Sequence, residues 1–181
     1  MATIHWKTMC PGHRYLVLTQ PIDHNVWRQQ PELLPRKSRR RFDYKLDWLN
    51  RLEARAAKLL ESEMPIVLGG DYNVIPNDRD CFDPAGWAGD ALTRPESRAA
   101  FRRLIHRGYT DALRSLHPNE VFYTYWDYQA GAWQRDHGVR IDHFLLSPEA
   151  LDRLKRVTID RDPRGLEKPS DHTPILCELG S

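Results

Sequence analysis

The stretch GGDYNVIP, residues 69–76, decides how this chain folds and where its chemistry lies. It follows the apolar run MPIVL, in which Ile66 to Leu68 has the composition of a short buried strand. The glycine pair ends that strand, and Asp71 and Asn73 come directly after it. A turn alone would need only glycine and one aspartate. The pairing of an acid with an amide therefore directs attention to a functional site.

Regular elements are predicted on both sides of this strand. Apolar residues spaced by three and four predict a helix over 43–62 and another over 95–109. The segment SPE, residues 147–149, combines a capping residue, a first-turn proline and a first-turn acid, and so predicts the start of a short helix. Further strands are predicted at Val121–Trp126, Arg140–Leu146, Val157–Asp160 and Thr173–Leu179. The expected fold class is α/β or α+β.

Composition limits the class of protein. A chain of 181 residues with 40% hydrophobic and 29% charged residues can form the core of one soluble domain. Its three cysteines are far apart and form no C-x-x-C pair, which fits a reducing compartment. The longest apolar run near the N-terminus, Tyr15 to Leu18, is too short for a signal-peptide core or a membrane span. We expect a cytoplasmic monomer that does not enter a membrane.

Charge divides the chain at Arg41. Residues 1–41 carry eight Lys or Arg against two acids, a net charge of +6, and the remainder carries nineteen against twenty-three. This head ends in RKSRRR, residues 36–41, and shows no sustained period of 2 or 3.6. Such a basic run can contact nucleic acid or can be a solvated tail. We divide the chain into an atypical basic head, 1–41, and a body, 42–181.

Three polar clusters fall at the predicted strand ends: GGDYN (69–73), RID (140–142) and KPSDHTP (168–174). Each alone has a simpler explanation, because Asp and Asn favour turns, Arg-x-Asp can form a surface ion pair, and Ser-Asp-His can be a loop. Together they supply carboxylates, a carboxamide and a histidine. These are the groups needed for metal-assisted phosphoester hydrolysis, in which hard oxygen ligands bind Mg²⁺.

The sequence resembles the endonuclease/exonuclease/phosphatase superfamily, and most closely its exodeoxyribonuclease III branch of abasic-site repair nucleases. The resemblance extends from about Phe42 to Leu179 and rests on four motifs in the family's order. They are GGDYNVIP, YTYWDYQAGAWQR, VRIDHFLLS and EKPSDHTPI. It implies a two-sheet β-sandwich flanked by helices, of which this body is the second half.

The resemblance also assigns roles to residues of the clusters. Asp71 would activate or position the attacking water, and Asn73 would hydrogen-bond the phosphate. His172 would contact the same phosphate, with Asp142 orienting its ring and favouring its charged form. The metal ion, Mg²⁺ with Mn²⁺ as an alternative, would be held by Asp71, Asn73, Asp171 and His172.

A DNA-binding surface is implied as well. Tyr125 and Trp126 resemble the place where the family packs an aromatic beside a flipped-out abasic sugar, although such aromatics often belong to the core. In the loop 127–138, Trp133 and Arg135 suit stacking and phosphate contact. Arg140 is counted with this set. The expected partner is double-stranded DNA with abasic sites or 3′ ends.

The family's first half has no counterpart among the motifs. It would supply an early-strand Asn, a catalytic Tyr and the Glu of a Q-E-x-K motif, the principal metal ligand. Residues 1–41 contain only QQPELLP, in which Glu32 is a poor substitute. Our hypothesis is that a frameshift, an internal start or a mispredicted gene start replaced this half. A half sandwich exposes strand edges and part of its core, so impaired activity is expected.

The function predicted from these motifs is a Mg²⁺-dependent DNA-repair nuclease that cuts 5′ of abasic sites and trims 3′ ends. One alternative is a non-catalytic DNA-binding remnant. Another is a phosphatase-type member of the superfamily acting on phospholipid or inositol phosphates. The motif YWDYQAGAWQR argues against this last alternative, because it resembles the DNA nuclease branch.

Overall fold

The computed structural model describes residues 4–10, 13–18 and 36–180, with the backbone alone for the first two ranges and for residues 36–39. The first sheet has the strand order β1-β2-β3-β5-β4, and a second sheet pairs β6 with β7. The strands are β1 (Ile4–Cys10), β2 (His13–Leu18), β3 (Val67–Asp71), β4 (Thr110–Asp111), β5 (Asp142–Leu146), β6 (Leu154–Ile159) and β7 (Ile175–Leu179). Strand β2 runs parallel to β3, and the other pairs are antiparallel.

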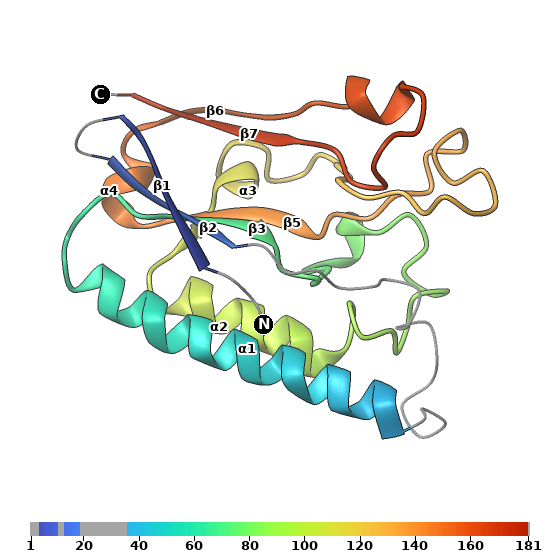
Figure 1. The fold of residues 1–181 in the computed structure, drawn as a ribbon, viewed down its shortest axis with the longest axis horizontal. Helices are drawn as coiled ribbons and strands as arrows, with labels where there is room; N and C mark the ends of the chain where they lie inside the picture. The colour runs from blue at the N-terminus through green and yellow to red at the C-terminus, as the bar shows by residue number, and fades with distance from the viewer. Residues whose placement is uncertain (1–3, 11–12, 19–35, 181) are drawn as a thin grey trace.

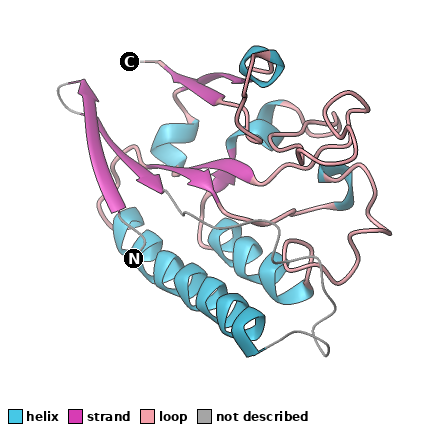
Figure 2. Ribbon diagram, turned by 45° about the vertical axis from the view of Figure 1, so that its right-hand side comes forward, coloured by secondary structure: helices cyan, strands magenta, loops and turns pink. Residues whose placement is uncertain are grey.

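Helices complete the layers. The α-helices are α1 (Arg36–Leu60), α2 (Pro95–His106), α3 (Ala112–Leu116) and α4 (Pro148–Leu151), with 3-10 turns η3 (Asp78–Asp80) and η4 (Asp162–Gly165). Helices α1 and α2 lie side by side on one face of the first sheet, and the β6–β7 sheet lies on the other (Figure 1). Figure 2 shows the same order of layers from a second direction.

Alternating side chains of β3 and β5 connect these layers. Leu68 and Leu145 are fully buried in the cluster formed with α1 and α2. Val67 and Leu146 belong to a second cluster, which includes Val157 of β6. Because successive strand residues point to opposite faces, the first sheet has a hydrophobic contact on each side. This arrangement of two sheets with helices confirms the predicted fold class.

The glycine pair at the end of β3 has a packing reason. A Cβ atom added at Gly69 would lie 2.4 Å from Phe144 Cε1, so a larger residue would displace that ring. Gly70 has a φ of +149°, a conformation that side chains rarely adopt. The pair therefore lets β5 approach β3 closely just before Asp71.

Several element predictions hold, and others need correction. The helix over 95–109, the strand behind GGDYN, the last three strands and the helix start at Ser147 are confirmed within a few residues. The first helix begins at Arg36 rather than residue 43, so the basic run forms its first turns and the charge boundary at Arg41 falls inside it. The head also contributes β1 and β2.

The strand predicted at Val121–Trp126 is wrong. The segment has a bend at Thr124 and isolated bridges at Tyr125, and its backbone bonds are shared between two neighbours instead of forming a ladder. The N–H groups of Thr124 and Tyr125 donate to Val139, whereas that of Trp126 donates to Asp171. β-favouring residues form a strand only where one continuous partner accepts and donates their backbone hydrogen bonds, and this segment has none among the described residues.

Candidate active site

The site is built where β3 ends and β5 begins. These strands are antiparallel, and Asp71 is the register partner of Asp142. His172, which precedes β7, lies with its Nδ1 2.9 Å from Asp142 Oδ2. An isolated bridge between Tyr125 and His172 fixes the backbone of this last segment. The fold thus brings together the four residues predicted to be catalytic, from segments about a hundred positions apart.

Asp71 and Asn73 form a closed turn. Asp71 Oδ1 accepts a hydrogen bond from the backbone N–H of Asn73 at 2.7 Å, and its Oδ2 accepts one from Asn73 Nδ2 at 2.8 Å. Asn73 has a φ of +51°, in the left-handed region that asparagine tolerates better than most residues. Its Oδ1 is buried and has no hydrogen-bond partner. The asparagine therefore presents an unmatched oxygen beside a carboxylate.

His172 is the cationic group of the site. Burial disfavours its charged ring, but the hydrogen bond and charge of Asp142, with the charges of Asp71 and Asp171, raise the pKa of His172 to about 9. At neutral pH the ring is an imidazolium whose Nδ1–H donates to Asp142. Its Nε2–H is then able to donate to an anion, and the role of the pair in contacting a phosphate stays a prediction.

Asp71 differs from His172, because its surroundings disfavour its charged form. Burial and the nearby charge of Asp142 raise the pKa of Asp71 to about 7, although His172, the Asn73 N–H and Lys45 oppose this rise. A carboxyl group of this pKa exchanges protons readily at neutral pH. A cation placed beside this carboxyl group would favour its ionised form.

The donors fit a hydrated divalent ion better than a closed metal cage. Among the residues that the structure describes, no group of three or more His, Cys, Asp or Glu side chains is arranged to hold a metal. Asp71 and the unpartnered Asn73 Oδ1 are hard oxygen donors, and Mg²⁺ commonly binds one or two such groups while keeping several waters. His172 has no free lone pair while its ring is charged, so a metal ion would have to displace a proton to bind it. Its role as a metal ligand stays a prediction.

Two predicted DNA contacts lie in the interior. Arg140 is fully buried, with Nε 2.7 Å from Asp80 Oδ1 and Nη1 2.8 Å from Asp111 Oδ2. Trp126 is also fully buried, and its Nε1–H donates to Asp136 at 3.0 Å. Neither side chain can reach DNA in this structure, so both predictions are corrected. Arg-x-Asp before a strand gives no sign of which way the arginine turns.

Of the other predicted DNA contacts, Tyr125 lies beside His172. The Tyr125 ring is 5.2 Å from the His172 ring, between centroids, and lines a pocket of about 150 Å³ with Arg135. Arg135 is exposed, and Trp133 is partly buried against Trp126 at 4.9 Å. Arg161 stacks over Trp133 at 5.0 Å and had no signal in the sequence. Contact of these residues with DNA remains a prediction.

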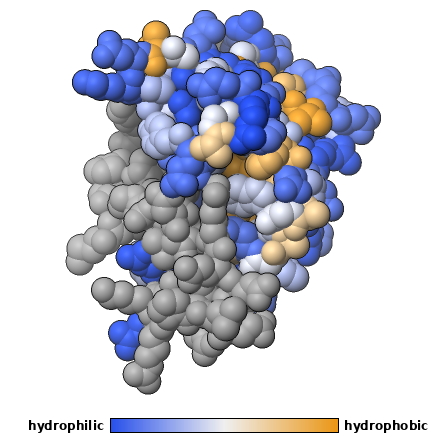
Figure 3. Space-filling model, turned by 90° about the vertical axis from the view of Figure 1, so that its right-hand side faces the viewer, coloured by the Kyte–Doolittle hydropathy of each residue, from blue (hydrophilic) through white to orange (hydrophobic). Residues whose placement is uncertain are grey.

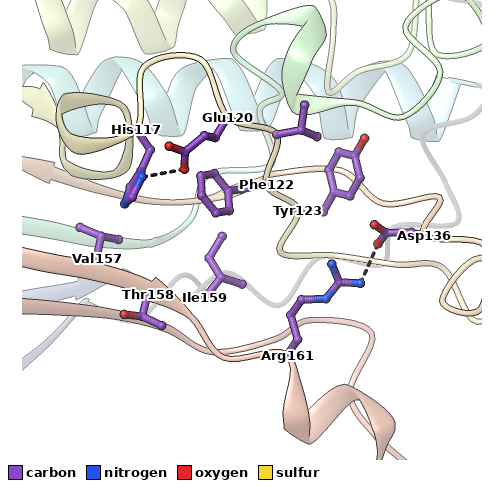
Figure 4. Close-up of a pocket in the computed structure, with 10 residues that line it drawn as sticks. His117, Glu120, Phe122, Tyr123, Asp136, Val157, Thr158, Ile159 and Arg161 are labelled. Carbon is purple, nitrogen blue, oxygen red and sulfur yellow. Dashed lines mark hydrogen bonds and ion pairs between the residues drawn. The ribbon is translucent and has the colours of Figure 1, made fainter.

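A larger hollow lies elsewhere. It has a volume of about 630 Å³ and lies between the segment 117–123 and β6, with the ion pairs His117–Glu120 and Arg161–Asp136 at 2.7 Å each (Figure 4). None of the predicted catalytic residues lines it.

The described part of the face in Figure 3 is mostly hydrophilic, with hydrophobic side chains in separate groups. Among the described residues, none of the helices is both long and apolar enough to cross a bilayer.

Lys45 is the buried residue near the site that sequence reasoning missed. Its Nζ donates to the backbone oxygens of Asn73 at 2.5 Å and Ala91 at 2.7 Å, and burial lowers the pKa of Lys45 to about 7. One signal was present. Lys45 stands four residues before Leu49 and seven before Leu52, a position on the apolar stripe of the helix.

The sequence and the fold of this chain are both similar to those of known proteins. The sequence model described as "Endonuclease/Exonuclease/phosphatase family" matches residues 4–172. The chain belongs to this family. The match includes most of the basic head, while the boundary proposed at Arg41 stays a prediction.

Relatives place the chain in the exodeoxyribonuclease III branch, as the motifs predicted. Exodeoxyribonuclease III of Haemophilus influenzae is 37% identical over 123 residues, which are 64% of this chain and 46% of the relative. DNA repair nuclease APEX1 of Danio rerio is 35% identical over 140 residues, 77% of this chain and 44% of the relative. The solved structure of an AP endonuclease from Archaeoglobus fulgidus is 30% identical, with a TM-score of 0.79 over 93% of this chain and 62% of that chain. The chain thus spans about half the length of the Haemophilus influenzae and Danio rerio relatives. Members of the family use a divalent metal.

Proposed function

We propose that this protein is a Mg²⁺-dependent DNA-repair nuclease that cuts the phosphodiester 5′ of an abasic site and removes nucleotides from 3′ ends. One observation carries the proposal. The imidazolium of His172, held by Asp142 at 2.9 Å, lies at the same strand ends as the Asp71–Asn73 turn. A fixed cation and a carboxyl group with a pKa of about 7 are suited to hydrolyse a phosphodiester.

Each residue has a role in that reaction. Asp142 fixes the orientation and charge of His172, whose Nε2–H donates to a phosphate oxygen as negative charge develops. Asp71 would accept the proton of the attacking water, and Asn73 Nδ2, which donates to Asp71 Oδ2, would use its second N–H to donate to the phosphate. Asp71 and Asn73 Oδ1 would hold the metal ion, which supplies Lewis-acid stabilisation of the phosphate when bound.

A second function is favoured by the incomplete ligand set. The described residues offer two metal donors in one place, and the chain spans about half of its curated relatives. A protein with this surface could bind DNA without cutting it. Such binding would persist in chelator and would weaken steeply with salt, because it depends on phosphate contacts.

The deciding experiment is incision of a labelled duplex with one abasic site, in Mg²⁺ or in chelator. We expect incision in Mg²⁺ only, and a loss of about 10³-fold or more in the Asp71→Ala variant because the base is removed. Asp47→Ala, which removes an exposed carboxylate of α1, is the matched control and should cut like the parent. Incision in chelator, or equal rates in Asp71→Ala, would refute the proposal. Folded protein that binds without cutting would support the second function.

A further inference from the structure

Three buried or half-buried side chains donate hydrogen bonds to the backbone of the turn that carries Asn73. Three successive backbone oxygens accept a hydrogen bond each from a different element. Asn73 O accepts from Lys45 of α1 at 2.5 Å, Val74 O from His143 of β5 at 2.9 Å, and Ile75 O from Arg98 of α2 at 2.9 Å. We call these donors the carbonyl cradle.

Lys45 makes the cradle contact nearest to the site. An ammonium group has three N–H donors, and all three are used, by Asn73 O, Ala91 O and Ser97 Oγ at 3.0 Å. The side chain is 1% exposed. Burial of an ammonium group is costly unless its donors are satisfied, so these three acceptors together fix the position of the Lys45 Nζ.

The conformation that Lys45 holds is itself unfavourable. A non-glycine residue with a φ of +51° costs free energy and persists only where its surroundings fix it. In this conformation Asn73 Nδ2 reaches Asp71 Oδ2 and its carbonyl points toward Lys45. Release of the carbonyl would let the residue relax and would move the amide away from the carboxylate.

We propose that Lys45 is a positioning residue, which holds the Asn73 carbonyl and thereby fixes the Asn73 amide and the Asp71 carboxylate in their working geometry. Lys45 touches neither substrate nor the reacting atoms. This inference rests on the proposed nuclease function for its kinetic consequence. Its structural consequence, the fixed position of the Asn73 side chain, is independent of that function.

The kinetic test replaces Lys45 with Met, which keeps the length of the stem and removes the three donors. A displacement of about 1 Å at a reacting group can cost about 10²-fold in rate, so we expect kcat for abasic-site incision to fall by about that factor. KM should change by less than about threefold, since the substrate contacts remain. Lys58→Met, an exposed lysine in the last turn of the same helix, should leave both constants unchanged.

A purely structural role for Lys45 would give a different pattern. Ser97→Ala removes one partner of Lys45 but leaves its bond to Asn73, so it should lower stability without the loss of kcat. In Lys45→Ala, n-propylammonium should restore part of kcat, whereas n-propanol should not. Equal kcat losses in Lys45→Met and Ser97→Ala, at equal stability in urea, would overturn the proposal. If Lys45→Met does not fold, Lys45→Gln, which keeps a neutral donor, replaces it in the same comparison.

A second readout needs no catalysis. In the folded protein, exchange of the Asn73 side-chain amide protons with solvent, followed by NMR, should be at least tenfold faster in Lys45→Met than in the parent and unchanged in Lys58→Met. Unchanged exchange in Lys45→Met would overturn the positioning role. If the parent does not cut DNA but the Asn73 amide responds as expected, the nuclease proposal fails and the positioning role stands.

Discussion

Two clusters of charged side chains lie near the start of β5, and they differ in how fully their charges are matched. In the Arg140 cluster, the guanidinium binds Asp80, Asp111 and the His143 ring, while Arg114 also binds Asp80. Burial alone would raise the pKa of Asp80, but Arg140 and Arg114 hold that pKa below its usual range. Every charged group in this cluster has a partner of opposite charge, although the buried Nε of Arg114 makes no hydrogen bond.

The cluster at the strand ends is matched less completely. Asn73 Oδ1 has no partner, and burial with a nearby negative charge raises the pKa of Asp71 to about 7. A matched buried cluster stabilises one structure, whereas an incompletely matched one retains capacity for a ligand or a proton. Residues in the first cluster should therefore affect stability, and residues in the second should affect function.

The largest expected effect is on catalysis. Asp142→Asn should lower the incision rate by about 10²- to 10⁴-fold, because the asparagine no longer fixes the charged ring of His172. Its free energy of unfolding in urea should change little by comparison. Asp47→Asn, an exposed acid on α1, is the control and should keep its rate. If Asp142→Asn cut normally or failed to fold, the contrast between the clusters would not hold.

Arg140→Met tests the matched cluster. Removal of the arginine leaves Asp80 and Asp111 without their main partner, so we expect a loss of about 3–5 kcal/mol in the free energy of unfolding. Arg135→Met, at an exposed position, should change it by less than about 0.5 kcal/mol. Urea unfolding curves of the two variants measure the difference. A stable Arg140→Met protein with weakened DNA binding would instead return Arg140 to the DNA surface.

The smallest expected effect is the pH dependence of stability due to His143. Burial, with the charge of Arg140, lowers the pKa of His143 to about 4, so the folded protein keeps this ring neutral. The unfolded chain takes up the proton near pH 6.5, so this contribution to stability is lost as the pH falls from about 6.5 to 4. The full loss is about 3 kcal/mol, at about 1.4 kcal/mol per pH unit.

Comparison with a His143→Gln variant isolates this contribution. Asp71, whose pKa is raised, acts in the opposite direction between pH 7 and 4, and the difference between parent and variant cancels it. Urea unfolding at pH 6.5 and pH 4.5 should show a smaller acid loss in the variant. Identical losses in both proteins would mean that the ring is already charged in the folded state.

The parts of the molecule that were predictable are those with a local signal. Helix α2 and strand β3 follow from apolar spacing and punctuation, and Asp71, Asn73, Asp142 and His172 were found because polar residues at strand ends are uncommon in that combination. The direction of a long side chain has no such signal. Arg140 and Lys45 both turn inward to partners more than 25 positions away in the chain, which only the folded structure brings near.

One measurement bears most directly on the strand-end cluster: the single-turnover rate of abasic-site incision by the whole chain, with and without Mg²⁺, beside Asp71→Ala and Asp47→Ala. We expect a Mg²⁺-dependent rate that is lost in Asp71→Ala and kept in Asp47→Ala. A rate that is independent of Asp71 would show that the ends of β3 and β5 are not the catalytic centre.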